Sequence, residues 1–373
     1  MAASEPTNKA GHPVRIGLFG HGWWCAKYLA PALTRAGAEL AAVCGRDQDR
    51  AAAAAAELGA PRSFRRMEDM LDELELDAVV ITSPPASHAR AVELVTAAGL
   101  PVYCEKPLAR DARESARMAA AAASVPNVAG FTQRWNAAVR TAHRLVTEGA
   151  VGEVRHVRYA TASVLSSDPA APWDWRYDPE EYSYGVLSDL GPHAVDMVRW
   201  FAGEVTEVIA HAEVVTPARV DAHGVRRPVG NWDDCTVDLR LASGARAAVH
   251  TSRVLALTPY RRFHHVLEVL GTRGGVSYDS DRPAEVVFAE SGTRPRTVPA
   301  DGLDIGDVTP GSFEEMLATT GHAADHQARD MLAVFAGECP EHVPSLTDGH
   351  TGQVVLDAAA RAVAERTWIP CKR

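Results

Sequence analysis

The sequence lacks the features that mark membrane, secreted and nucleic-acid-binding proteins. No run among its 373 residues approaches the ~18 apolar residues that a membrane helix needs. Residues 1–13, "MAASEPTNKAGHP", contain no apolar core, and we expect a loose tail there rather than a signal peptide. The net charge is −10, so neither nucleic acid nor an anionic membrane surface is expected as a main partner. We therefore expect a cytoplasmic protein.

Paired cysteines are also lacking. The six cysteines are scattered, with no CxxC pair and no His-rich neighbour. This spacing favours reduced thiols over a disulfide framework or a zinc site, so no metal site is expected. The length and the 46% hydrophobic content allow a sizeable core, which predicts two domains.

Short apolar strands alternate with helical patterns in residues 14–132. The pattern predicts strands at 14–20, 38–45, 77–83, 101–107 and 127–135 and helices at 23–37, 47–59, 67–76, 87–99 and 110–123. Strands that alternate with helices are typical of βαβ units in a parallel sheet. We expect a doubly wound α/β domain over residues 14–132.

The pattern changes after about residue 150. Longer segments with alternating apolar and polar residues are separated by Gly- and Pro-rich turns, and they cover 153–164, 204–215, 235–254 and 264–279. This alternation predicts a mostly antiparallel open sheet with one packed face. Helical patterns return at 189–202 and 351–366. Residues 133–373 are therefore expected to form an α+β domain.

A glycine-rich loop follows the first expected strand. "GLFGHGWWCAKY" supplies Gly20, Gly22 and Cys25 in a G-x-G-x-x-(small) arrangement between a strand and a helix that opens at Trp23. In that setting the glycines allow a tight turn and the close approach of a pyrophosphate to the helix N-terminus. The alternative is an ordinary Gly-rich turn that binds no dinucleotide.

The second strand ends without the expected acidic residue. A NAD site usually presents a carboxylate to the ribose there, whereas this sequence has Cys44 and Gly45 followed by Arg46. Arginine without a carboxylate favours the 2′-phosphate of NADP. Asp47 keeps NAD possible if the strand ends one residue later, and Arg46 has two alternative roles, stacking on the adenine or facing solvent.

Lys106 lies in "YCEKPLARD", where an apolar strand is ending. Pro107 biases Lys106 toward extended backbone, which places it at the strand edge where open α/β sheets bind ligands. A lysine beside a nicotinamide and a hydroxyl substrate can transfer a proton or polarise the oxygen. The alternative is a solvated lysine beside a turn proline.

A second candidate pair lies in "YGVLSDLGPHAVDMVRWFAG". Asp189 and His193 are four residues apart at the start of an expected amphipathic helix, which places both side chains on one face. Asp189 can orient the imidazole, and His193 can act as a general base. The alternative is that Asp189 caps the helix and His193 is a core histidine.

Together these motifs resemble the Gfo/Idh/MocA oxidoreductases, the glucose–fructose oxidoreductase and inositol dehydrogenase family. The G-x-G loop, "CEKP", "WRYDPE" and "DLGPHAVD" occur here in the family's order. The resemblance implies an N-terminal Rossmann domain and a nicotinamide-dependent dehydrogenase or reductase that acts on a sugar, cyclitol or related polyol. It also implies that Lys106, Asp189 and His193 are the catalytic residues.

The resemblance implies further cofactor contacts. "TSPPASH" matches a loop whose backbone lies along the cofactor, with His88 nearby, and Glu105 would lie near the nicotinamide ribose. The remaining expected cofactor contacts are Trp23, Ser83, Pro84, Trp175 and Arg176. The sequence departs from the family pattern at two places. Tyr184 lies in a run before the Asp that is often all glycine, and we expect it to reshape the substrate pocket. Trp23 and Trp24 are bulky where smaller residues are common, and we expect them to narrow the cofactor entrance.

Two other activities fit the same motifs. Some relatives retain their cofactor and use transient oxidation to epimerise, eliminate or cleave a glycosidic bond, and a non-catalytic NADP- or sugar-binding regulator would keep the fold. The protein is expected to form a homodimer or homotetramer through the face of the C-terminal sheet. Arg261 and Arg262 are expected either to meet an anionic group of the substrate or to lie in a surface loop.

Overall fold

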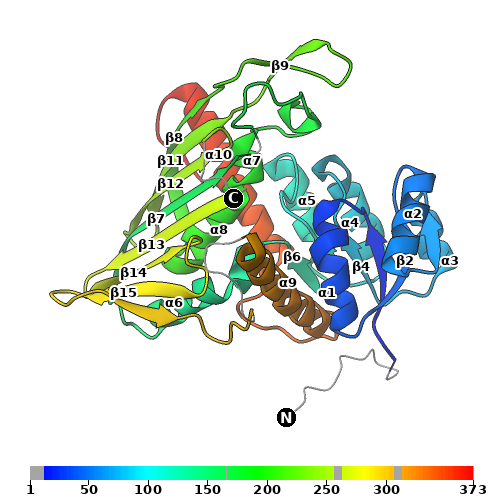
Figure 1. Ribbon diagram of the computed structural model, residues 1–373, viewed down its shortest axis with the longest axis horizontal. Helices are drawn as coiled ribbons and strands as arrows, with labels where there is room; N and C mark the ends of the chain where they lie inside the picture. Colours follow the sequence, from blue (N-terminus) through cyan, green and yellow to red (C-terminus); the bar gives the residue numbers. More distant parts are fainter. Residues whose placement is uncertain (1–11, 165, 256–262, 306–312, 373) are drawn as a thin grey trace. The chain divides into compact units, whose positions relative to one another are not determined.

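The computed structural model describes residues 12–164, 166–255, 263–305 and 313–372 (Figure 1). The chain forms two compact units, one of Met1–Thr132 with Thr320–His350 and the other of Gln133–Thr319 with Thr351–Arg373. The segment Thr320–His350 groups with the first unit although it follows most of the second in sequence. The domain division after residue 132 stays a prediction. Along the described chain, no helix has both the length and the apolar character needed to cross a membrane.

The first unit is built on a parallel sheet. Within the described residues its six strands lie in the order β3-β2-β1-β4-β5-β6, and all the paired strands are parallel. This is the strand order of a dinucleotide-binding Rossmann fold, with the switch point between β1 and β4. The strands are β1 (Arg15–Phe19), β2 (Glu39–Cys44), β3 (Arg62–Phe64), β4 (Ala78–Ile81), β5 (Val102–Cys104) and β6 (Asn127–Ala129).

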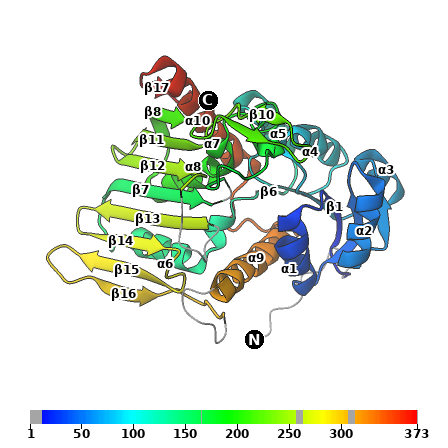
Figure 2. The same cartoon turned by 45° about the horizontal axis from the view of Figure 1, so that its top comes forward.

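Strands β4 and β5 are buried on both faces, which explains their unbroken apolar sequence. On one face, side chains of β2, β4 and β5 share a core with α3, α4 and α5. On the other face, Tyr103 of β5 contacts Gln327 of α9, and α9 lies alongside α1 (Figures 1 and 2). The helices are η1 (Cys25–Leu29), α1 (Ala30–Arg35), α2 (Gln48–Leu58), α3 (Met67–Glu73), η2 (Pro85–Ser87), α4 (His88–Ala97), α5 (Ala112–Ala122) and α9 (Phe313–Phe335).

The carboxyl ends of three neighbouring strands lie level with one another. Phe19 of β1 pairs with Ile81 of β4, and Ile81 pairs with Cys104 of β5. The turns that follow these residues contain the glycine loop, the Ser83 loop and Lys106. The fold therefore brings three of the predicted cofactor segments to one edge of the sheet.

The second unit is built on a larger sheet. Its nine described strands lie in the order β16-β15-β14-β13-β7-β12-β11-β8-β17, and all the paired strands are antiparallel except β7 and β12. A separate hairpin joins β9 (Ala218–Val220) and β10 (Arg226–Pro228). The sheet strands are β7 (Val154–Ser163), β8 (Val205–Glu213), β11 (Asp234–Leu241), β12 (Arg246–Ser252), β13 (Phe263–Gly271), β14 (Gly274–Asp279), β15 (Glu285–Glu290), β16 (Arg296–Pro299) and β17 (Ile369–Pro370).

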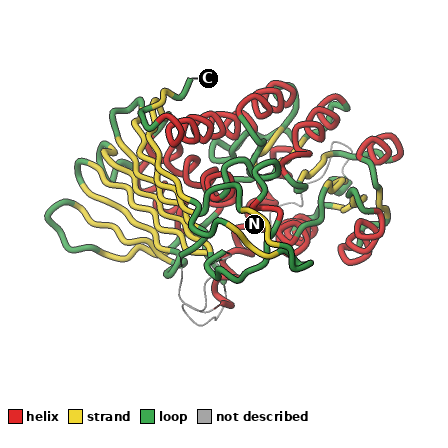
Figure 3. Tube along the Cα trace, turned by 90° about the horizontal axis from the view of Figure 1, so that it is seen from above, coloured by secondary structure: helices red, strands yellow, loops and turns green. Residues whose placement is uncertain are grey.

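One face of this sheet is covered and the other is open. Alternate residues of β11 are buried and exposed, as a half-buried antiparallel strand requires. Figure 3 shows the strands as one layer with the helices of the same unit along one side. The core on the covered side includes residues of α6 (Ala137–Thr147), α7 (Val186–Asp189), α8 (Gly191–Ala202) and α10 (Leu346–Glu365). Two short 3-10 turns, η3 (Thr132–Trp135) and η4 (Trp175–Tyr177), also occur in this part of the chain. The predicted fold class, a Rossmann sheet plus an α+β part with a mostly antiparallel open sheet, is confirmed.

The helix expected at 23–37 differs from the prediction in its hydrogen bonding. Residues Cys25–Leu29 form a π-helical turn, after which α1 continues from Ala30 with Pro31 near its start. Proline has no N–H to donate to the carbonyl of Lys27 four residues earlier, so a regular α-helical ladder cannot run through this point. The change lies in the turns that follow the glycine loop.

Candidate active site

The turn after β1 depends on the absence of a side chain at Gly20. Gly20 has φ +103°, and a Cβ there would lie 2.5 Å from the main-chain nitrogen of Ser83. The hydroxyl of Thr82 donates to the carbonyl of Gly20 at 3.0 Å. The turns after β1 and β4 are therefore packed backbone against backbone, so any larger residue at Gly20 would separate them.

The second glycine of the loop faces open space. Apart from the two neighbouring residues in the chain, no described residue has an atom within 4 Å of a Cβ built on Gly22. The helical segment begins at the next residue, Trp23, which is 58% exposed. Open space beside a helix N-terminus fits a pyrophosphate, because the unpaired N–H groups and the helix dipole both favour negative charge. The third position, Cys25, is fully buried, and burial raises the pKa of its thiol to about 11, so the thiol stays neutral.

The end of β2 presents an arginine and a carboxylate that is already engaged. Asp47 caps α2, since one of its oxygens accepts from the N–H groups of Asp49 and Arg50 at 3.1 Å. Arg46 is exposed and has no ion-pair or hydrogen-bond partner among the described residues. The ring of His21 packs against Gly45, where a Cβ would lie 2.9 Å from His21 Nε2.

His88 is fully buried and links the Ser83 loop to the residues after Lys106. Its Nε2 lies 2.7 Å from the carbonyl oxygen of Ser83, and its Nδ1 lies 3.1 Å from that of Pro107 and 3.2 Å from that of Leu108. Burial lowers the pKa of His88, and these carbonyls oppose that shift. Both ring nitrogens contact main-chain carbonyl oxygens, so His88 holds the Ser83 loop against the segment that follows Lys106.

Glu105 and Lys106 directly follow β5. The carboxylate of Glu105 accepts the main-chain N–H of Lys106 at 3.0 Å, and Lys106 is partly buried. Burial raises the pKa of Glu105, while the phenol of Tyr103 and the charge of Lys106 oppose that shift. Within the first unit, Gly20, Ser83, His88, Glu105 and Lys106 are thus brought together at one sheet edge.

The pair predicted in the second half of the chain does not lie in one continuous helix. Asp189 ends α7, and His193 lies in the first turn of α8, with Leu190 between the two helices. Asp189 does not cap α8, whose N-terminal cap is Leu190. His193 is 9% exposed, and Asp189 accepts a hydrogen bond from the phenol of Tyr182 at 3.3 Å.

Trp175 and Arg176 form a short 3-10 turn in the second unit. The Arg176 guanidinium pairs with Asp174 at 3.1 Å and stacks on the Trp175 ring at 4.5 Å. The main-chain carbonyl of Arg176 accepts from Asn231 at 2.9 Å and from Arg253 at 3.2 Å. Asn231 and Arg253 are buried, and no local sequence pattern marked them as supports of this turn.

Tyr182 connects the two predicted groups of the second unit. Its ring packs edge-on against Trp175 at 5.3 Å, and its hydroxyl bonds Asp189. Tyr184, the departure noted in the sequence, donates to Asp357 at 3.3 Å and stacks with Trp232 at 6.1 Å. Arg261 and Arg262 lie outside the described residues.

Comparison with known proteins decides the family. The sequence profile of the oxidoreductase family with an NAD-binding Rossmann fold matches residues 14–132, and that of the GFO/IDH/MocA C-terminal domain matches residues 139–277. The chain belongs to the Gfo/Idh/MocA oxidoreductases. The predicted family is therefore confirmed, and the protein is an NAD(P)-dependent oxidoreductase that acts on CH–OH groups.

Individual relatives in this family are named for sugars and cyclitols. An inositol 2-dehydrogenase of Rhizobium meliloti is 28% identical over 95% of this chain and 98% of its own length. A D-xylose 1-dehydrogenase (NADP(+)) of Haloferax volcanii is 31% identical over 74% and 81%. The structure of a levoglucosan dehydrogenase with NADH and levoglucosan superposes with a TM-score of 0.85 at 26% identity, covering 97% of this chain and all of that one.

Proposed function

We propose that the protein oxidises a secondary alcohol of a sugar, cyclitol or related polyol to a ketone, with NADP as the preferred hydride acceptor, and that it catalyses the reverse reduction. The observation that carries the proposal is the place of Lys106, directly after β5 and level with the turns that contain Gly20 and Ser83. Open α/β sheets bind ligands at this edge. The nicotinamide, when bound, supplies the hydride chemistry.

The residues of the first unit fit a dinucleotide. The open space at Gly22 suits the pyrophosphate, and Trp23 has most of its indole free to contact a ligand. Ser83 and Pro84 offer main-chain groups, and His88 contacts the carbonyl oxygen of Ser83 at 2.7 Å. Glu105 is proposed to lie near the nicotinamide ribose.

NADP is favoured over NAD by the end of β2. Arg46 is free to meet a 2′-phosphate, whereas the carboxylate of Asp47 is occupied by the N-terminus of α2. Replacement of Arg46 by Ser should therefore weaken NADP binding about tenfold or more while NAD binding changes little, because one charge-assisted contact is lost. Titration calorimetry with each cofactor measures this, and equal losses for both would contradict the assignment.

The proton transfer is assigned to Lys106, Asp189 and His193. An imidazole nitrogen of His193 accepts the proton of the substrate hydroxyl as the hydride leaves the carbon that bears this hydroxyl. Asp189 orients the imidazole and stabilises its protonated form. The Nζ of Lys106 hydrogen-bonds the reacting oxygen and holds its developing charge. Trp175 and Arg176 are proposed to contact the cofactor from their turn, which Asn231 and Arg253 hold rigid.

The substrate class is inferred from the named relatives. The assay therefore uses myo-inositol, levoglucosan and D-xylose with NADP or NAD, and it records both the appearance of reduced nicotinamide and the product. Oxidation of a polyol with stoichiometric reduced cofactor supports the proposal. Product without reduced cofactor would show a retained-cofactor enzyme, and tight sugar binding without any product would show a non-catalytic regulator.

A matched pair of variants tests the role of Lys106. Lys106→Met should lower kcat by about 10²–10⁴-fold, the usual share of a proton-transfer group, with little change in cofactor affinity. Lys372→Met removes an exposed lysine near the end of the chain and should leave kcat unchanged. Equal kcat in both variants would contradict the assignment.

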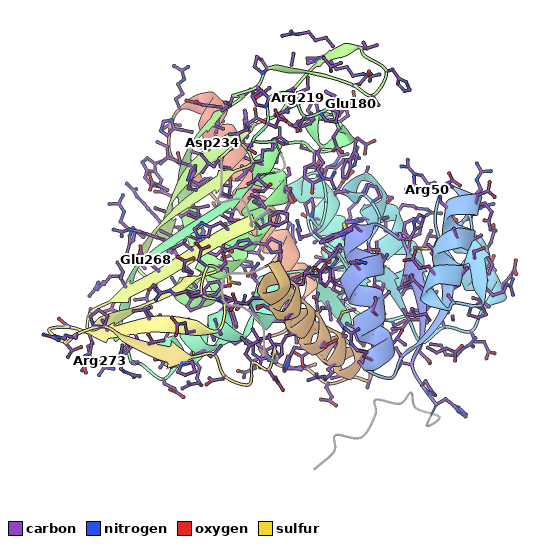
Figure 4. All side chains as sticks on the ribbon, viewed as in Figure 1. Arg50, Glu180, Arg219, Asp234, Glu268 and Arg273 are labelled. Atoms are coloured by element: carbon purple, nitrogen blue, oxygen red, sulfur yellow. The ribbon has the colours of Figure 1, made fainter. Side chains whose placement is uncertain are left out.

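We also propose that the open sheet face joins two or four copies in the cytoplasm. Asp234 and Glu268 lie on this face, away from the helices (Figure 4), and a depression of about 400 Å³ is lined by residues of β7, β11, β12 and β13. Ala160, an exposed residue of β7, lines it. Ala160→Arg should convert the assembly to monomers in light scattering, and an unchanged mass would contradict this.

A further inference from the structure

The carboxylate of Glu105 has both oxygens engaged inside the first unit. One oxygen accepts from the phenol of Tyr103 at 2.5 Å, and the other accepts the main-chain N–H of Lys106 at 3.0 Å. The side chain is buried, with 9% of the residue exposed. The carboxylate therefore couples the interior of the sheet to the backbone at Lys106.

The phenol of Tyr103 is itself held from the far side of β5. Successive side chains of a strand point to opposite faces, so Tyr103 points away from the core that holds Cys104. There, the amide Nε2 of Gln327 donates to the Tyr103 oxygen at 2.9 Å. Both side chains are fully buried, and Gln327 lies in α9, 224 residues further along the chain.

Gly130 closes the space around this contact. It follows β6, and its N–H donates to the carbonyl of Cys104 at 2.9 Å. A Cβ on Gly130 would lie 2.7 Å from the Tyr103 oxygen and 3.0 Å from both Cα and Cδ of Glu105. The main chain of Gly130 therefore packs closely against the phenol and the carboxylate, and no larger residue fits there without displacing them.

We propose that Tyr103 and Gln327 are positioning residues for Lys106, acting through Glu105. The inference rests on the catalytic role assigned to Lys106 above. Gln327 fixes the phenol, the phenol fixes the carboxylate, and the carboxylate fixes the Lys106 main chain at the start of its side chain. The three consecutive hydrogen bonds are buried and restrict the positions of the groups they join, and small displacements of a catalytic group are costly.

The pKa shifts of Tyr103 and Glu105 agree with donation from the phenol to the carboxylate. Burial raises the pKa of Tyr103 well above its ordinary value, so the phenol keeps its proton and donates it. Burial also raises the pKa of Glu105, and the donated bond from Tyr103 and the charge of Lys106 oppose this. Burial also raises the pKa of the Cys25 and Cys104 thiols, so neither adds a negative charge near Glu105.

Three variants separate positioning from packing. Tyr103→Phe removes the donated bond but keeps the ring. Gln327→Met keeps the volume and removes the amide, whose Oε1 has no hydrogen-bond partner among the described residues. The control, Tyr278→Phe, removes a buried phenol that accepts from Asn136 at 2.9 Å in the second unit.

The first readout does not depend on activity. Hydrogen exchange at the Lys106 amide should be about tenfold faster or more in Tyr103→Phe, because its acceptor is no longer held, and several-fold faster in Gln327→Met. The control should not change it. The Tm of Gln327→Met should be equal to or above that of the wild type, since an unsatisfied carbonyl is removed. Lys106 exchange at the wild-type rate in both variants, or a lower Tm with unchanged exchange, would overturn the inference.

The second readout is the pH dependence of kcat. Loss of the Tyr103 bond raises the pKa of Glu105 further, so its anionic form is lost at a higher pH as the solution is acidified. The acid limb of the kcat profile should therefore move to higher pH in Tyr103→Phe and stay in place in Tyr278→Phe. If the wild-type enzyme shows no turnover, the proposed function is refuted, and the hydrogen-exchange test of Tyr103 and Gln327 can still be made. If the enzyme is active but the acid limb of Tyr103→Phe does not move, the positioning role of Tyr103 and Gln327 is refuted and the proposed function stands.

Discussion

Replacing each glycine of the first loop by alanine should have a different effect: Gly20→Ala should lower the stability of the fold, and Gly22→Ala should weaken cofactor binding. At Gly20, the backbone has φ +103°, and a Cβ would lie 2.5 Å from Ser83 N and 2.6 Å from Thr82 C. The positive φ costs about 1–3 kcal/mol and the overlap with main chain costs about 1–3 kcal/mol, so Gly20→Ala should lose about 2–6 kcal/mol of unfolding free energy. Such a loss is visible in urea denaturation of the apoprotein.

Gly22→Ala should leave the fold intact and damage cofactor binding. The added methyl meets no described atom, so the apoprotein should keep its stability to within about 1 kcal/mol. The same methyl occupies the space assigned to the pyrophosphate and should weaken NADP binding about tenfold or more, the effect of a steric overlap worth 1–3 kcal/mol. Calorimetric titration measures the Kd. Wild-type affinity in Gly22→Ala, or an unfolded Gly22→Ala apoprotein, would refute the assignment of the loop.

Two further predictions concern stability. Arg134 and Asp196 form a buried ion pair at 2.7 Å. Arg134→Met leaves the Asp196 charge buried without this partner and should lower the unfolding free energy by about 3–5 kcal/mol in urea denaturation. Arg62→Met, which breaks an exposed ion pair with Glu73, should lower it by at most about 1 kcal/mol, and equal losses in the two variants would contradict this. Asp234 raises the pKa of His250 by hydrogen bonding. The stabilisation is fully present below the ordinary pKa of about 6.5 and lost as pH rises through the raised pKa, so the Tm gap between wild type and His250→Gln should shrink between about pH 6 and pH 9; a gap that grows would contradict it.

The sequence was informative where a local pattern determines structure. Strands β1, β4 and β5 are short apolar runs between turn residues, and the glycines mark the turn after β1. These features predict the Rossmann fold and the sheet edge that holds Lys106. The strand β3 was missed because "RSF" is three residues long with a charge at its start. The helix α6 was missed although "AAVRTAHRLVT" has apolar residues at helical spacing.

Contacts between distant segments had no such signal. Nothing near Gln327 indicates that its amide meets Tyr103, and α9 itself was not predicted because polar residues and Gly321 interrupt its apolar pattern. The full burial of His88 was equally hidden, since its ring nitrogens contact main-chain carbonyls whose positions follow only from the fold. From the sequence, Asp47 was a possible ligand of the cofactor ribose, whereas in the structure its carboxylate caps the N-terminus of α2.

The central claim is that Lys106 and His193 act in the same proton-transfer step. A double-mutant cycle in kcat with Lys106→Met, His193→Asn and the double variant tests it most directly, with a polyol deuterated at its carbinol carbon to show that hydride transfer is being observed. Groups that act as a unit are strongly non-additive, so the double variant should lose little more than the worse single variant. Losses that multiply across the cycle, or a single variant with wild-type kcat, would contradict the account.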